Sequence, residues 1–145
     1  YLAADRPLRQ IAWDEQQPAF WIAEAGSEAD AVRHVLAQPH VYAVGAHEQC
    51  GCGFDYGQLP LEDDKDRVED AACRESVRRL REYLAEAVAR GPVELYASWS
   101  DDLPKEPLKR IEVGPAYFDG EEFALENRTL FRVTKESRSL QQVAP

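Results

Sequence analysis

The residue types that can carry out chemistry are concentrated in one short segment of this chain, residues 47–53, with the sequence His-Glu-Gln-Cys-Gly-Cys-Gly. The segment supplies an imidazole and two thiols, which are ligand types that zinc prefers. Three protein ligands with an open fourth position are typical of a catalytic zinc site. We therefore expect His47, Cys50 and Cys52 to bind a transition metal, and zinc is the favoured ion.

The spacing of the two cysteines imposes a geometric condition on such a site. In a flat strand, side chains i and i+2 lie about 6.6 Å apart on one face, whereas two sulfurs on one tetrahedral zinc lie about 3.8 Å apart. The backbone must therefore curl, and we expect the curl at Gly51 because glycine reaches positive φ angles freely. Glu48 and Asp101 are the carboxylates expected to orient the ligands or to act as a general base.

Three other interpretations of the segment stay open. Cys50 and Cys52 can form a small disulfide whose strain makes it oxidising, although the carboxylate of Glu48 would raise the thiol pKa values if it lies close. One cysteine can be a nucleophile, with His47 as its base and Asp101 as the group that orients the base. The segment can also be a tight glycine loop in which cysteine acts as a small buried hydrophobe.

The elements that position this segment follow from the hydrophobic pattern. Residues 40–46 are almost all apolar, which predicts a strand buried on both faces. Residues 66–90 carry apolar side chains at three- and four-residue steps, which predicts a long amphipathic helix, and residues 93–99 form the next predicted strand. Together they predict a βαβ unit whose parallel strands place residues 47–48 and 98–102 at one edge of the sheet, where α/β sheets bind ligands. The apolar stripe of this helix comprises Val68, Cys73, Val77, Leu80, Leu84, Ala87 and Val88. Because Cys73 belongs to the stripe, we expect its thiol to be buried in the core.

Shorter apolar runs predict the rest of the fold. A helix is expected from Ser27 to about Gln38, where Pro39 ends it. We expect one α+β domain over residues 1–145, with a mixed β-sheet, the long helix packed on it and a polar tail over residues 135–145. Further strands are expected over four segments, 1–4, 19–24, 108–113 and 129–134.

Composition and charge limit the partners that the chain can bind. Its 145 residues include 27 acidic and 17 basic ones, which gives a net charge of −10. Such an acidic surface disfavours nucleic acid and anionic membranes, because both require clustered Lys and Arg. Three cysteines without a secretion signal favour a cytoplasmic location with reduced thiols. Because the chain has no Met and starts at Tyr1, we expect that residues are missing ahead of it.

Zinc binding or a reactive thiol pair within residues 47–53 is therefore the leading functional hypothesis. The alternative is a non-enzymatic interaction or small-ligand-binding domain in which this loop is only structural. The sequence leaves open whether the protein is an enzyme.

The pattern His-Glu-x-Cys-Gly-Cys-Gly-Phe over residues 47–54 also resembles a group of small bacterial proteins of unknown function. The resemblance extends to residues 1–8, to Trp13-Asp14 and to residues 92–96. It implies a bacterial domain but no activity, so it assigns no catalytic role to any residue of this chain.

Overall fold

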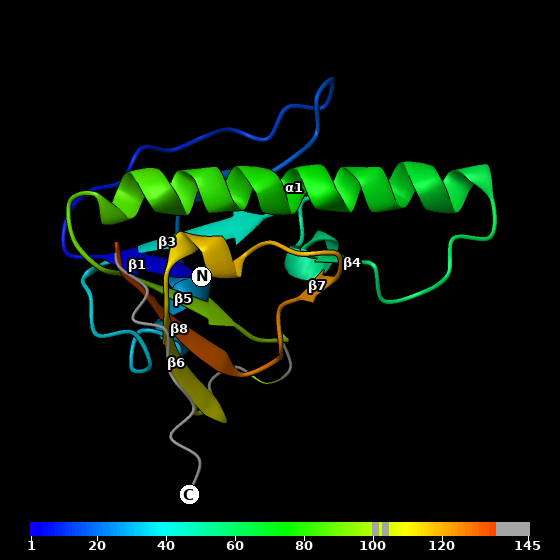
Figure 1. Cartoon of the computed structure of the whole chain (residues 1–145). Coiled ribbons are helices and arrows are strands. Elements are labelled where there is room, and N and C mark those ends of the chain that lie inside the picture. The colour runs from blue at the N-terminus through cyan, green and yellow to red at the C-terminus, as the bar shows by residue number, and fades with distance from the viewer. Residues whose placement is uncertain (100–101, 103–104, 136–145) are drawn as a thin grey trace, which may run out of the picture.

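The computed structural model describes residues 1–99, 102 and 105–135. In this part of the chain one long helix packs against a mixed six-stranded sheet (Figure 1), which confirms the predicted α+β class. The helix is α1 (Asp64–Val88), and the order of strands in the sheet is β2-β3-β1-β5-β8-β6. The strands are β1 (Leu2–Ala4), β2 (Trp21–Glu24), β3 (His40–Gly45), β5 (Val93–Ala97), β6 (Lys109–Val113) and β8 (Thr129–Val133).

A second, two-stranded sheet and short 3-10 helices complete the described fold. β4 (Asp55–Tyr56) pairs antiparallel with β7 (Phe123–Ala124). The sequence pattern missed both, because a two-residue strand is too short to show alternation. The 3-10 helices are η1 (Ser27–Ala31), η2 (Gly51–Gly53) and η4 (Pro115–Tyr117).

The predicted βαβ unit is present, but another strand is inserted between its two strands. β3 and β5 each pair antiparallel with β1, so they run in the same direction on either side of it. The carboxyl ends of β3 and β5 therefore lie at one edge of the sheet. The chemistry-bearing segment, residues 47–53, starts at this edge.

α1 is capped at its N-terminus by Asp63 and is followed at its C-terminus by Gly91. The Asp63 carboxylate accepts a 2.8 Å hydrogen bond from the N–H of Asp66, and Gly91, just past the helix, has a φ angle of 139° that favours glycine. The N-terminal turns of α1 extend past the six-stranded sheet (Figure 1). This overhang explains why Val68 is 71% exposed, so its predicted place in the core is wrong.

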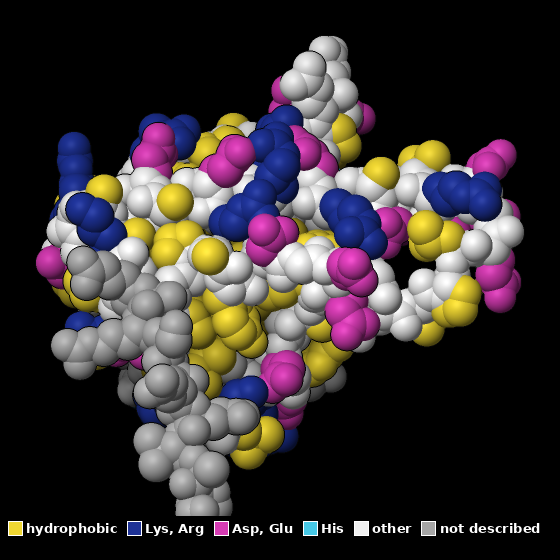
Figure 2. Space-filling model, in the orientation of Figure 1, with side chains coloured by type: hydrophobic (Ala, Val, Ile, Leu, Met, Phe, Trp, Pro, Cys, Tyr) yellow, Lys and Arg dark blue, Asp and Glu magenta, His cyan; other side chains and the backbone are white. Residues whose placement is uncertain are grey.

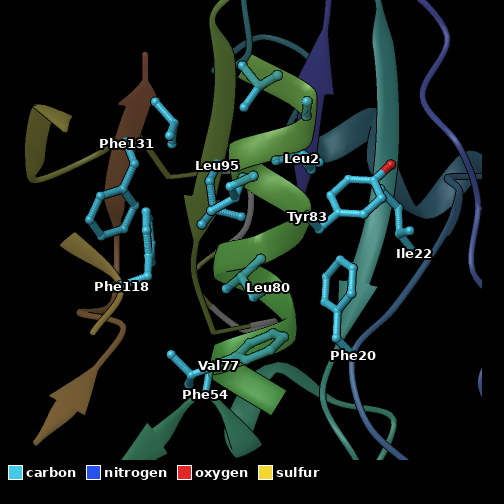
Figure 3. Packing of buried hydrophobic residues seen from close by; sticks show 14 of the residues in the cluster. Leu2, Phe20, Ile22, Phe54, Val77, Leu80, Tyr83, Leu95, Phe118 and Phe131 are labelled. Atoms are coloured by element: carbon cyan, nitrogen blue, oxygen red, sulfur yellow. The ribbon is translucent and has the colours of Figure 1, made fainter. Parts of the chain in front are cut away.

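The face of the sheet toward α1 carries the larger hydrophobic cluster (Figure 3). Leu2 of β1 and Leu95 of β5 meet Leu80 and Leu84 of α1, and all four side chains are buried. Complete burial of one leucine contributes about 1.5–3 kcal/mol to folding. Cys73 belongs to the same cluster, which confirms its predicted burial.

The opposite face of the sheet is covered by the segment between β2 and β3, whose small apolar side chains form a second cluster. The predicted helix from Ser27 to Gln38 is wrong in type and length, because only η1 is helical there. The 3-10 helix stops at Ala31. At the far end of the predicted span, the carboxylate of Glu94 accepts 2.9 Å hydrogen bonds from the N–H groups of Ala37 and Gln38, which bonds that end of the segment to the sheet.

Charged side chains of both signs are interspersed along the exposed side of α1 (Figure 2). Arg79 Nε lies 2.9 Å from Glu75 Oε1, and Arg78 Nη1 lies 2.5 Å from Glu82 Oε1. Both are i,i+4 pairs that stabilise a helix by a few tenths of a kcal/mol each. Among the described residues, no helix combines the length and apolar character that crossing a membrane requires.

Candidate functional site

The loop that follows β3 is held in place by two indole groups. Trp13 Nε1 donates a 3.0 Å hydrogen bond to the carbonyl of His47, and Trp21 Nε1 donates a 3.2 Å bond to the carbonyl of Gln49. Gly45 makes the second contact possible, because a Cβ there would lie 2.3 Å from Trp21 Nε1 and 2.5 Å from the Gln49 carbonyl oxygen. These contacts fix the backbone on both sides of the candidate site.

The backbone curls as the cysteine spacing requires, but not in the way that the sequence predicts. Gln49 has a φ angle of 70°, whereas Gly51 is not among the described residues with positive φ and instead starts η2. The N–H of Ala46 donates a 2.9 Å hydrogen bond to the carbonyl of Cys50, which closes the turn. The chain therefore does curl at Gly51, as predicted, but through a 3-10 turn and without a positive φ angle, and the left-handed residue of the loop is Gln49.

The side chain of His47 is buried against α1 and is 7% exposed. Its Nε2 lies 2.9 Å from Glu69 Oε1, and its Nδ1 lies 3.3 Å from Ser76 Oγ. The backbone N–H of His47 donates to the same hydroxyl at 3.1 Å. Both ring nitrogens are therefore directed at oxygen atoms of the helix, and the ring orientation is fixed at both ends.

Cys73 completes a compact group around the Glu69 carboxylate. Its Sγ donates to Glu69 Oε1 at 3.8 Å, and the residue is 7% exposed. Burial, followed by the charge and hydrogen bond of Glu69, raises the pKa of the Cys73 thiol to about 12. His47, Glu69 and Cys73 form the one group of three metal-ligand atoms within 4.8 Å of one another in the described part of the chain.

The structure places Cys50 and Cys52 beside each other but outside this group. Both line a cavity of about 760 Å³ at the sheet edge where β3 and β5 end. Cys52 is exposed and Cys50 is partly buried, and both thiols are free. A hydrogen bond with the Cys50 thiol, then desolvation, and to a smaller extent the charge of Glu48, raise the pKa of Cys52.

Of the two carboxylates that were predicted to support the site, Glu48 and Asp101, the structure describes only Glu48. Glu48 is exposed and acts on Cys52 through its charge, which is the effect expected of a carboxylate near a thiol. Asp101 lies outside the described residues. The ligand set His47, Cys50 and Cys52 remains a prediction.

Sequence reasoning missed Glu69 and Ser76 and gave Cys73 only a packing role. The three residues are separated by four and three positions, which places them on one face of α1. That spacing was visible in the sequence. What the sequence did not show is that the end of β3 packs beside this turn of the helix, where His47 meets it.

Comparisons of the chain with protein-family models, with curated proteins and with solved structures found no match.

Proposed function

We propose that this protein binds a transition metal ion, with zinc favoured, through His47, Glu69 and Cys73. The observation that carries the proposal is the convergence of a nitrogen, an oxygen and a sulfur donor within 4.8 Å. Glu69 Oε1 lies close to both His47 Nε2 and Cys73 Sγ, so a nitrogen and a sulfur atom converge on one carboxylate oxygen. A zinc ion would replace the proton of the Cys73 thiol, because zinc ligands bind in their deprotonated forms.

The distances between the donor atoms are close to those that a zinc ion requires. Tetrahedral zinc holds a nitrogen and an oxygen ligand about 3.4 Å apart, and an oxygen and a sulfur ligand about 3.6 Å apart. The corresponding separations are 2.9 Å from His47 Nε2 to Glu69 Oε1 and 3.8 Å from that oxygen to Cys73 Sγ. The third pair, His47 and Cys73, lies within 4.8 Å, whereas a nitrogen and a sulfur on one zinc ion lie about 3.6 Å apart. Shifts of up to about 1 Å in these side chains, of which Glu69 is half-exposed, would make room for the ion.

The surroundings of the group favour binding of an ion. Ser76 Oγ contacts His47 Nδ1, and such a partner on the second ring nitrogen orients a metal-bound imidazole. The side chain of Glu69 is 52% exposed, so a fourth position on the ion would be open to water. An ion with three protein ligands and one water can activate that water or polarise a carbonyl group.

The alternative set of His47, Cys50 and Cys52 requires more rearrangement. The His47 ring would have to leave both Glu69 and Ser76 to reach the two cysteines. The metal would gain a second thiolate but would lose the carboxylate of Glu69. Substituting Cys73 in one variant, and Cys50 with Cys52 in another, shows which of the two ligand sets binds the metal.

The experiment is metal analysis of protein purified without a histidine tag, combined with cobalt substitution. We expect about one equivalent of bound zinc in the wild-type protein and in Cys50→Ser/Cys52→Ser, and loss of binding in Cys73→Ser and Glu69→Gln. Glu82→Gln, an exposed carboxylate on the same helix, is the matched control for Glu69→Gln. Cobalt bound to the wild-type protein should show a sulfur-to-cobalt absorption band that Cys73→Ser lacks.

Two results would contradict the proposal. Wild-type protein with less than about 0.1 equivalent of any metal, and with no rise in melting temperature on addition of zinc, would exclude a metal site. Binding that survives Cys73→Ser but not Cys50→Ser/Cys52→Ser would move the site to the alternative ligand set.

A further inference from the structure

Cys50 and Cys52 lie outside the proposed metal group, which consists of His47, Glu69 and Cys73, and their backbone spacing can be compared with that of disulfides. Gly51, between the two cysteines, belongs to the 3-10 helix η2. Residues that flank one helical residue have Cα atoms about 5.5 Å apart, which lies inside the range of about 4.4–6.8 Å found for disulfides. Cys50 is also the largest influence on the pKa of Cys52, and both residues line the same cavity. The backbone spacing of the pair is therefore compatible with a disulfide between them.

The cavity beside the pair suits the apolar part of a small molecule. Its walls include the aromatic side chains of Trp21, Phe54 and Trp99 together with apolar side chains from β3 and β5. Ser98 and Asn127 add polar groups at the same edge of the sheet. A volume of about 760 Å³ lies within the range of ordinary small-molecule sites.

The charge around the cavity also restricts what it can bind. Among the described residues that line it, Asp55 carries a negative charge and no Lys or Arg is present. Glu48 adds a second negative charge close enough to act on Cys52. An anionic ligand would be repelled, so a neutral one is favoured.

We infer that Cys50 and Cys52 carry out thiol–disulfide exchange with a small neutral organic disulfide whose apolar body occupies this cavity. The inference is independent of the metal group. Cys73, the thiol of that group, is buried and points at Glu69, so it takes no part in the exchange.

The reaction balances with the groups at hand. One protein thiolate attacks a sulfur of R–S–S–R, the sulfur–sulfur bond breaks, and the departing R–S⁻ takes up the proton that the first thiol lost. The second protein thiol loses its proton and attacks the mixed disulfide, which releases the second R–S⁻ to be protonated. The substrate gains two electrons and leaves as two thiols, while Cys50 and Cys52 become a disulfide. Two molecules of a small thiol, R′–SH, restore the pair: the first opens the protein disulfide to a mixed disulfide, and the second attacks that mixed disulfide and leaves as R′–S–S–R′.

The test uses the neutral aromatic disulfide 4,4′-dithiodipyridine and the anionic glutathione disulfide, with a chelator present so that the metal group has no influence. One equivalent of dithiodipyridine should release two equivalents of thiopyridone from the wild-type protein. Mass spectrometry should then show the loss of two hydrogens and no attached pyridine. Cys50→Ser and Cys52→Ser should each stop at the mixed disulfide after one equivalent of thiopyridone.

The contribution of the cavity is measured by comparing reaction rates of the protein with those of a peptide of residues 47–53. The peptide has the same two thiols but lacks the other residues that line the cavity. Rates for each disulfide are divided by the rate for the peptide, so that the intrinsic reactivity of the reagent cancels. This ratio should be about tenfold larger for dithiodipyridine than for glutathione disulfide. Trp99→Ala should reduce the ratio for dithiodipyridine, whereas Leu108→Ala, an exposed residue that does not line the cavity, should leave it unchanged.

A wild-type protein that accumulates the mixed disulfide would overturn the exchange step. Equal ratios for the two disulfides, unaffected by Trp99→Ala, would overturn the role of the cavity.

Discussion

The imidazole of His47 is held between two oxygen atoms of one helix, the hydroxyl of Ser76 and the carboxylate of Glu69. The sequence singled out His47 as a candidate metal ligand. It grouped His47 with Cys50 and Cys52 because these residues are neighbours in sequence. The contacts instead come from residues at least twenty positions away, and only the packing of the β3 end against α1 brings them to the ring.

Two glycines of the same loop are expected to respond in opposite ways to substitution. A Cβ at Gly53 would lie 2.7 Å from Ala46 Cβ and 2.9 Å from the ring of His47, whereas a Cβ at Gly51 would have no atom within 4 Å. Gly53→Ala should therefore destabilise the protein by about 1–3 kcal/mol and displace the imidazole. Gly51→Ala should change stability by less than about 0.5 kcal/mol.

Urea unfolding of the two variants measures this difference. Zinc affinity should fall in Gly53→Ala and stay unchanged in Gly51→Ala, because only the first moves His47. Similar stability losses in both variants would show that the loop is equally tight at both positions, contrary to the structure.

At the scale of elements, the long periodic segments were predictable and the short or interrupted ones were not. The strands of the six-stranded sheet and α1 lie within a few residues of their predicted bounds, because burial on one or both faces leaves a pattern that extends over several residues. The helix expected after Ser27 has the right local signals. The structure forms only the short 3-10 helix η1 there, and the far end of the segment bonds instead to the carboxylate of Glu94, which comes from a strand far away in sequence.

Glu94 is accordingly expected to stabilise the segment between β2 and β3. Glu94→Ala removes the acceptor of two 2.9 Å hydrogen bonds, from the N–H groups of Ala37 and Gln38, and should destabilise the protein by about 1–3 kcal/mol. Glu94→Gln keeps an acceptor oxygen but loses the charge, so its effect should be about half as large.

Urea unfolding midpoints test whether Glu94→Ala is less stable than Glu94→Gln. In Glu94→Ala, hydrogen exchange of the backbone amides should also become faster at Ala37 and Gln38. An Ala variant as stable as the Gln variant would mean that water replaces the carboxylate without loss.

At the scale of the whole molecule, one edge of the sheet carries both candidate groups, the proposed metal ligands and the cysteine pair. The segment after β3 directs His47 toward α1 and directs Cys50 and Cys52 toward the cavity. The sequence predicted this edge from the parallel course of β3 and β5. The division of the segment into two groups depends on where α1 lies over the sheet, and no local pattern reveals that.

Protonation links the proposed metal site to the stability of the whole protein. The Cys73 thiol has its pKa raised to about 12 from an ordinary value of 9.0, so in the metal-free protein it keeps its proton at neutral pH. Zinc must displace this proton, and the affinity should rise about tenfold for each pH unit from this group alone. The stabilisation by saturating zinc should therefore grow by about 1.4 kcal/mol per pH unit between about pH 6 and 8.

Melting temperatures measured with and without zinc at several pH values in that range test the link, with Mg²⁺ as a control cation that prefers oxygen ligands. The measurement must stay below pH 9, since above the unfolded pKa of 9.0 the unfolded chain loses the Cys73 proton while the folded protein retains it to about pH 12. In that alkaline window the metal-free protein itself becomes less stable. A zinc-induced shift that is constant or decreases from pH 6 to 8 would mean that no thiol proton is displaced, and Cys73 could not then be a ligand.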